Sequence, residues 1–391
     1  MIDVFLVVFM LLITLALYFL ISKEAVQNLN GSIIEKTIKR QNMLPKYIFA
    51  VTIFAASILI FSFRFIGTKN GVPYGGIDAQ AYRSRFDAAT GDIFSAIAGQ
   101  DNEWGYGFFV FFIRLFTSDF QVFLGVYYCI LFILAVRATK SLKFRNDNKV
   151  LTILLLFCFV VQPIIMSMNL MRNVLAYFIV FDAYRLLCKK KFLFSILVTL
   201  LAMSIHMSAI IFLFVIFVNF ILKNKRRSLS EYILFFLLFI ALGYVLFLIA
   251  KSFMSGTKYE IYFYVEEGMA FASGLFVQRI MILVSLFCAY GRNKIKAKDY
   301  YAFLLFFSGF LVFVIQPFFS VAYRMHEYIN IAIIYLLQNI YSPNSSESSI
   351  YRREPIIALM IKAVALFIPF YMIVFSFFME SIPASGLYFL F

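Results

Sequence analysis

Three arginines stand in stretches of the chain that are otherwise apolar: Arg172 in NLMRNVLAYF, Arg279 in LFVQRIMIL and Arg324 in VAYRMHEY. A guanidinium keeps its proton, so each must meet water, a carboxylate or an anionic ligand. The paired N–H groups of a guanidinium match the spacing of phosphate oxygens, and one diphosphate can bind two or three arginines in this way. For one arginine alone, a side chain that reaches along the helix to water is an equal explanation. Three of them together favour a diphosphate site.

Two carboxylates and a histidine could transfer protons beside these arginines: Asp78 in GGIDAQAY, Glu103 in NEWGYGFF and His206 in AMSIHMSA. Glu103 is the preferred general base, because arginines nearby would keep it ionised and keep His206 neutral for hydrogen bonding to substrate. Asp78 is the third candidate. The alternatives are a carboxylate favoured by a helix dipole at Glu103 and a buried histidine bonded to a backbone carbonyl at His206.

Aromatic rings flank the two carboxylates. Tyr82, Trp104 and Tyr106 suit a pocket wall on which sugar rings stack, so we predict that they bind a glycan. The chain has no HExxH motif, no Cys/His quartet and no Walker or Rossmann pattern. We therefore expect neither a metal nor any other cofactor.

The elements that hold these residues must be membrane helices. Of the 391 residues, 63% are hydrophobic and 14% charged, and the mean hydropathy is +0.91. These values predict an all-α polytopic integral membrane protein with one membrane domain over residues 1–391. A net charge of +15 could suggest nucleic acid, but the basic residues form short clusters between apolar runs. We expect no nucleic-acid partner.

The basic clusters predict the topology. Six of them hold 24 of the 35 lysines and arginines and mark the cytoplasmic side. An even number of crossings between clusters then gives about twelve transmembrane helices, with both termini outside, at residues 2–21, 47–63, 120–136, 150–166, 171–187, 192–205, 207–222, 231–250, 274–290, 300–316, 326–341 and 355–378. Residues 64–119 and 251–273 form two external loops.

Two of the apolar segments have unusual lengths. Residues 192–222 are 31 in number, long for one crossing and short for two, so we predict a break at His206. Residues 105–116 are too few to cross and predict a re-entrant or interfacial helix in the first loop. Broken helices at membrane depth line a cavity or are buried in protein, and we expect a GT-C-like external cavity here.

The order of these motifs resembles a known family. The motifs are D-x-x-x-Y at 78–82, E-x-G-Y at 103–106, M-R-N-x-L-A at 171–176, a segment ending in I-H-M-S-A-I at 205–210, and Arg324 with Tyr328. Together they resemble the Wzy/EpsG-type polymerases of bacterial O-antigen (lipopolysaccharide), capsule and exopolysaccharide, over roughly residues 70–340. The asparagine Asn173 departs from the glutamine that is common after the arginine in that family.

The resemblance implies a metal-independent membrane glycosyltransferase. Its donor and acceptor would be glycans linked to undecaprenyl diphosphate, used on the outer face of the bacterial cytoplasmic (inner) membrane, and its partners membrane lipid, a flippase and a chain-length regulator. Arg172, Arg279 and Arg324 would bind the diphosphate. Two alternatives stay open: an O-antigen ligase, and a transporter or flippase for lipid-linked glycans. A transporter should carry buried charges near both faces, whereas Asp182 is the main one in an inner half.

Overall fold

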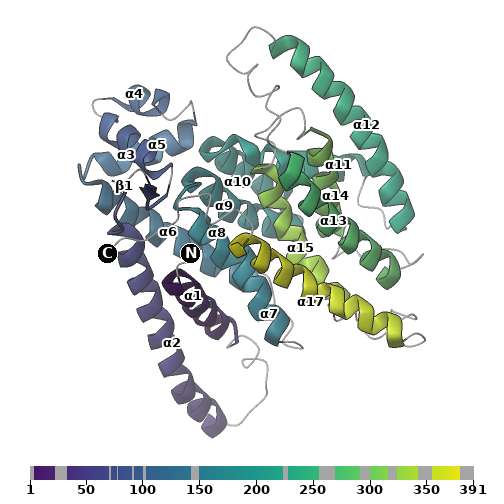
Figure 1. The fold of residues 1–391 in the computed structure, drawn as a ribbon, viewed down its shortest axis with the longest axis horizontal. Coiled ribbons are helices and arrows are strands. Elements are labelled where there is room, and N and C mark those ends of the chain that lie inside the picture. Colours follow the sequence, from purple (N-terminus) through teal and green to yellow (C-terminus); the bar gives the residue numbers. More distant parts are fainter. Residues whose placement is uncertain are drawn as a thin grey trace. The chain divides into compact units, whose positions relative to one another are not determined.

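The computed structural model in Figure 1 is almost entirely α-helical. It describes residues 4–22, 33–69, 72–76, 78–89, 92–99, 103–141, 149–222, 228–254, 269–290, 300–315, 324–341 and 355–378. The chain separates into two compact units, which are described one at a time. Unit 1 contains residues Met1–Ile179, Leu201–Met207 and Pro369–Phe391, and unit 2 contains Val180–Leu200 and Ser208–Ile368.

Within the described residues, each stretch predicted to cross the membrane is largely helical. The helices are α1 (Val4–Ser22), α2 (Ile33–Ser62), α6 (Phe120–Ser141), α7 (Lys149–Leu156) continued by a π-helical turn (Phe157–Val161) and α8 (Gln162–Met166), α9 (Met171–Cys188), α10 (Phe192–Ile205), α11 (Ile210–Leu222), α12 (Leu229–Met254), α13 (Met269–Tyr290), α14 (Tyr300–Ile315), α15 (His326–Tyr341) and α17 (Pro355–Phe378).

Length and composition identify fewer membrane spans than this. Among the described residues, three helices are long and apolar enough to cross a bilayer, at Leu44–Ser62, Phe120–Lys140 and Lys149–Met166. Other apolar helices, such as Phe192–Ile205, are shorter. The number twelve and the external cavity therefore stay predictions. Most of the predicted second loop, residues 255–268, lies outside the described part of the chain.

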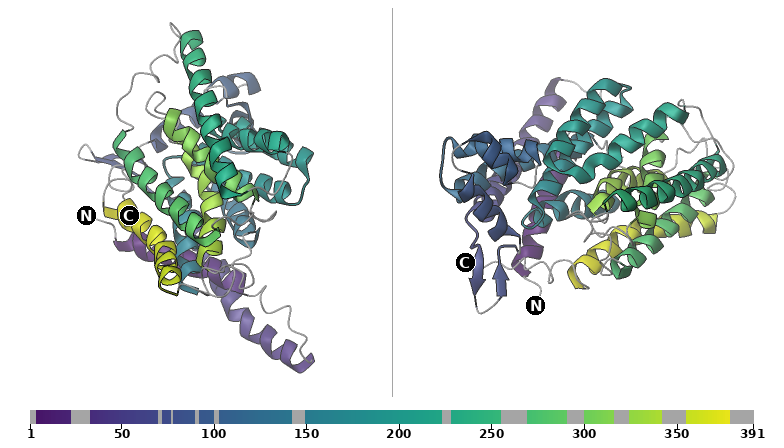
Figure 2. Two further views of the ribbon diagram at one scale, coloured as in Figure 1. Left: turned by 90° about the vertical axis from the view of Figure 1, so that its right-hand side faces the viewer. Right: turned by 90° about the horizontal axis from the view of Figure 1, so that it is seen from above.

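The predicted first loop is more structured than expected. It contains a two-stranded antiparallel hairpin, β1 (Gly67–Lys69) with β2 (Val72–Tyr74), and the short helices α3 (Ala79–Ala88), α4 (Ile93–Ala98) and α5 (Trp104–Arg114). The hairpin is a departure from a purely α fold. Figures 1 and 2 show these elements gathered at the C-terminal end of α2. Helix α5 is the short helix predicted at 105–116.

A proline shapes the helix that runs from α7 to α8 in unit 1. Pro163 has no N–H to donate to the carbonyl of Phe159 one turn earlier, and a π-helical turn lies at this point. The hydroxyl of Tyr177 donates to that carbonyl at 2.8 Å. This bond attaches α9 to the preceding helix inside the core of unit 1.

The chain reverses direction between α9 and α10 and again between α10 and α11. The turn Lys189–Lys191 joins α9 to α10, with Lys190 in the left-handed region at φ 59°, and Ser195 donates to the carbonyl of Ala183 at 2.8 Å. The rings of Phe192 and Phe220, at the start of α10 and near the end of α11, lie 5.8 Å apart. This contact makes α10 and α11 antiparallel, as the predicted break at His206 requires. Helix α14 packs against α11, α12 and α15.

Candidate active site

Glu103, Arg172 and His206 meet in unit 1, although they lie far apart in the sequence. Oε2 of Glu103 forms an ion pair with Nη1 of Arg172 at 2.8 Å. Oε1 of Glu103 is 2.5 Å from Nδ1 of His206 and accepts a longer bond of 3.4 Å from the backbone N–H of Met207. All three side chains are largely buried, with 13%, 12% and 8% of their surface exposed. The partner of Arg172 is therefore a carboxylate.

The contact with Glu103 selects the tautomer of the imidazole. An ionised carboxylate only accepts hydrogen bonds, so Nδ1 of His206 must carry the proton in this pair. In the neutral imidazole, Nε2 is then a proton acceptor. Among the described residues, no group forms a hydrogen bond with this buried Nε2. His206 therefore has an oriented basic nitrogen. Oε1 of Glu103 is bonded to His206, and Oε2 is ion-paired with Arg172 but accepts no hydrogen bond from the described residues.

Two glycines allow α5 to place Glu103. A Cβ at Gly105 would clash with the side chain of Ser204 near the end of α10, and a Cβ at Gly107 would lie 2.7 Å from the Cα of Ile97 in α4. The first turn of α5 therefore lies directly against α10, next to His206. The segment 105–107 is a packing motif, a role that the sequence argument did not assign to it.

Arg172, the other member of the ion pair, is positioned by contacts at the start of α9. The hydroxyl of Tyr127 donates to the carbonyl of Met171 at 2.9 Å, next to Arg172. The turn just before α9 also contacts the first loop, because Oδ1 of Asn169 accepts from the backbone N–H of Asp78 at 3.4 Å. Gly76 makes this approach possible, since a Cβ there would lie 2.5 Å from the carbonyl oxygen of Met168.

The three predicted glycan-binding rings have different surroundings. The guanidinium of Arg172 lies over the ring of Tyr82 at 5.7 Å, and this ring meets Tyr106 edge to face at 6.2 Å. Both tyrosines are buried, with 8% and 1% exposure, whereas Trp104 is 60% exposed. Burial raises the pKa of the Tyr106 hydroxyl well above its ordinary value, so this group stays protonated. Of the three rings, only that of Trp104 is exposed.

Asp78, the third predicted catalytic residue, lies at the surface. It precedes α3 as its N-cap residue, forms no side-chain capping bond and is exposed. In the part of the chain that the structure describes, no hydrogen bond or ion pair joins its carboxylate to Glu103, Arg172 or His206.

The other two predicted diphosphate ligands belong to unit 2. Arg279 is fully buried on α13, and its Nη2 lies 3.5 Å from Oδ1 of Asn330 on α15. Glu327 is near enough for an electrostatic interaction with Arg279. Arg324 precedes α15 and is half-buried. Each of these arginines is therefore described only within its own unit.

The fold and this cluster define a helical membrane protein with a glutamate, a histidine and an arginine in contact. Residues 47–388 match the EpsG family, and the chain belongs to that family. Membership supports a polysaccharide polymerase-type membrane protein and confirms the family that the motif order predicted. No curated protein and no solved structure matches the chain. Within the described ranges, no three histidine, cysteine, aspartate or glutamate side chains are grouped to hold a metal ion.

The role of Gly105 can be tested by adding one methyl group. Gly105→Ala should lower the free energy of unfolding by about 1–3 kcal/mol, because α5 cannot approach Ser204 without a shift. The measurement is thermal unfolding of the purified protein in detergent. The matched control is Gly125→Ala on α6, where a Cβ makes only an ordinary 3.6 Å contact. The double variant Gly105→Ala/Ser204→Gly should recover part of the loss. Equal stability of the two alanine variants would contradict this packing.

Proposed function

We propose that this chain is a glycosyltransferase that polymerises undecaprenyl-diphosphate-linked repeat units on the outer face of the bacterial cytoplasmic membrane. Family membership supports the polymerase class. The observation that carries the proposal is the Glu103–His206 pair, which leaves a basic nitrogen without a protein partner among the described residues. Glycosyl transfer to a hydroxyl needs such a base.

In the proposed reaction, an acceptor hydroxyl oxygen attacks the anomeric carbon of the donor glycan. The bond from that carbon to the diphosphate oxygen breaks, and its electron pair leaves with undecaprenyl diphosphate. The hydroxyl proton passes to Nε2 of His206. The imidazolium that forms is stabilised by Glu103, which is 2.5 Å from Nδ1.

This division of roles differs from the one that the sequence favoured. There Glu103 was the preferred base and His206 a hydrogen-bonding partner. The contacts support His206 as the base and Glu103 as the group that orients it, because Glu103 is held by both Arg172 and His206. Asp78, exposed and outside these contacts, is the weakest of the three candidates.

Arg172 has two parts in the proposal. Its ion pair orients Glu103. Its positive charge also favours the anionic leaving group, whose charge grows as the glycosidic bond breaks. Arg279 and Arg324 remain predicted diphosphate ligands, and Trp104 the predicted stacking surface for a sugar. A flippase and a chain-length regulator remain predicted partners.

One assay separates the three candidate activities. Purified protein in lipid nanodiscs is supplied with an undecaprenyl-diphosphate-linked repeat unit, and the products are resolved by glycan length. A ladder of longer glycans with release of undecaprenyl diphosphate supports polymerase. New product only when a lipid A core is added indicates a ligase. In sealed vesicles, movement of the substrate without any new glycosidic bond indicates a transporter, and either of these last two results would overturn the proposal.

A further inference from the structure

In unit 1, a buried arginine just beyond the end of α2 lies outside the Glu103 cluster. Arg64 is only 4% exposed. Its Nε donates to the carbonyl of Gly75 at 2.9 Å, and its Nη1 donates to the carbonyl of Phe61 and to the hydroxyl of Tyr128. Gly75 can present its carbonyl here because it adopts a left-handed φ of +75°. All three partners are neutral.

The charge of Arg64 has no counter-ion among the residues that the structure describes. No carboxylate there forms an ion pair with it, and its Nη2 is buried without a hydrogen bond. A buried guanidinium without an anion is costly, because desolvation is not compensated by a paired charge. The group is thus held in place with one donor remaining for an anion.

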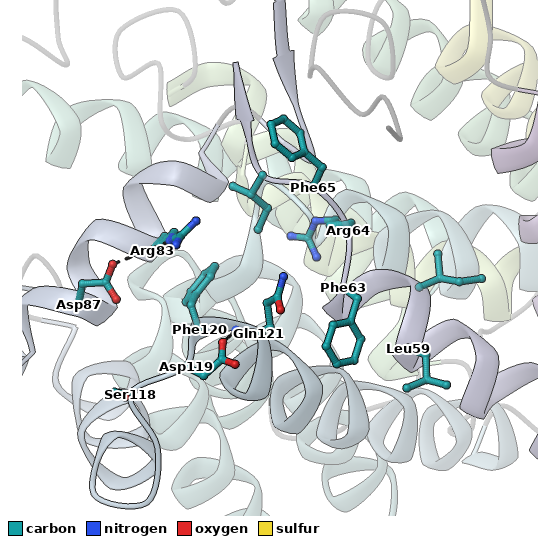
Figure 3. A pocket seen from close by; sticks show the side chains of 12 residues that line it. Leu59, Phe63, Arg64, Phe65, Arg83, Asp87, Ser118, Asp119, Phe120 and Gln121 are labelled. Carbon is teal, nitrogen blue, oxygen red and sulfur yellow. Dashed lines mark hydrogen bonds and ion pairs between the residues drawn. The ribbon is translucent and has the colours of Figure 1, made fainter. Parts of the chain in front are cut away.

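Arg64 forms part of the wall of a pocket of about 910 Å³. Figure 3 shows its guanidinium directed toward the space between the start of α6 and Arg83. Two acids also line this pocket, and both already have partners. Asp119 accepts from the N–H of Gln121 at 2.7 Å, and Asp87 forms a 3.9 Å pair with Arg83 in which both side chains are more than half exposed.

The Arg83–Asp87 pair is easily opened. An exposed pair at this distance contributes little to stability, so Arg83 can turn toward an anion in the pocket. Two arginines on different elements would then share the oxygens of one phosphate.

The rest of the wall fits a hydrocarbon chain. Apolar residues line the pocket beside Arg64, and of these Leu59 and Phe63 are 58% and 63% exposed. Arg64 lies two residues beyond the apolar helix Leu44–Ser62, which is long enough to cross a membrane. A residue just beyond such a span lies at the depth of lipid headgroups.

We infer that this pocket binds the phosphate headgroup of a membrane lipid, with the phosphate against Arg64 and Arg83 and the hydrocarbon along Leu59 and Phe63. The site is separate from the Glu103 cluster, and the inference does not depend on glycosyl transfer. Phosphatidylglycerol and undecaprenyl phosphate share the required chemistry, since each joins a phosphate to long apolar chains.

The test is native mass spectrometry of the full-length protein in detergent, with one probe added at a time. The probes are phosphatidylglycerol, undecaprenyl phosphate, diacylglycerol and inorganic phosphate. The protein should retain at least one of the two phosphate-bearing lipids, and the one retained identifies the source. Diacylglycerol, which has apolar chains but no phosphate, should not be retained.

Gln121→Glu is the decisive variant. Gln121 is exposed and lines the same pocket, so this change of nearly equal size supplies an internal carboxylate without removing any bond of Arg64. It should weaken lipid retention about tenfold, whereas the neutral control Gln121→Ala should retain the lipid. Arg64→Gln should also lose it, although loss of its three bonds can affect folding. Unchanged retention by Gln121→Glu, equal retention of diacylglycerol, or binding of inorganic phosphate alone would overturn the inference.

Discussion

Replacing His206 with alanine should slow chain extension by roughly 10²–10⁴-fold, the range that a positioned general base contributes. The reason is the contact that fixes the imidazole: Nδ1 is 2.5 Å from Glu103, so Nε2 is the nitrogen that can accept the acceptor's proton. The measurement is the initial rate of glycan lengthening by purified protein with a lipid-linked repeat unit.

Two further measurements separate a base from a structural residue. Free imidazole should partly restore the rate of His206→Ala, because it can occupy the space that the ring leaves and accept the proton. The neighbouring Met207 is 60% exposed and makes only a backbone contact with Glu103, so Met207→Ala should keep nearly the full rate. A His206→Ala protein that folds and extends glycans at the normal rate would show that His206 is not the base.

The helices were predictable from the sequence for a simple physical reason. A crossing needs about 20 apolar residues, and positive charge collects on the cytoplasmic side. These two constraints act locally and along the whole chain, so helices such as α6 and α9 lie where hydropathy placed them. The break at His206 followed from the length of the apolar segment, the even number of crossings between basic clusters, and the polar residues near the middle of the segment.

The structure of the first loop could not be predicted in the same way. The hairpin at 67–74 and the helices α3 and α4 are short, and short elements depend on tertiary packing more than on local pattern. Their positions follow from close approaches at Gly76, Gly105 and Gly107. The sequence does not show which atoms these glycines approach.

The sequence predicted which residues form the candidate site, but only partly which of them contact one another. Residue type and membrane context identified Glu103, Arg172 and His206 as unusual. Glu103 precedes α5, Arg172 is on α9 and His206 follows α10, and no sequence spacing predicts that these three side chains meet. From the sequence alone, Arg172 was therefore assigned to a diphosphate and Glu103 to the role of base. In the proposed mechanism, the ion pair of 2.8 Å gives Arg172 the additional role of orienting Glu103, and the base becomes His206 instead of Glu103.

Glu103→Gln should lower the maximal rate of chain extension by about 10³–10⁴-fold and change the KM for the lipid-linked substrate little. The substitution keeps the size of the side chain but removes its charge. An amide can donate to Nδ1 and thereby hold the imidazole with its proton on Nε2, where it cannot act as a base; the same change in the Ser-His-Asp triad costs about 10⁴ in rate. It also leaves Arg172 without its carboxylate partner.

The double variant Glu103→Gln/His206→Ala tests whether the two residues act as one unit. Residues that act as one unit are not additive, so the double variant should be no slower than the slower of the two single variants. Arg172→Lys is the matched probe of the other contact, because it keeps the charge and loses the planar fork, and its effect should shrink in the Glu103→Gln background. If Glu103 itself took the proton, His206→Ala would leave much of the rate, Glu103→Gln would leave none, and imidazole would rescue neither. That result would return the base to Glu103 and reduce His206 to its hydrogen-bonding partner.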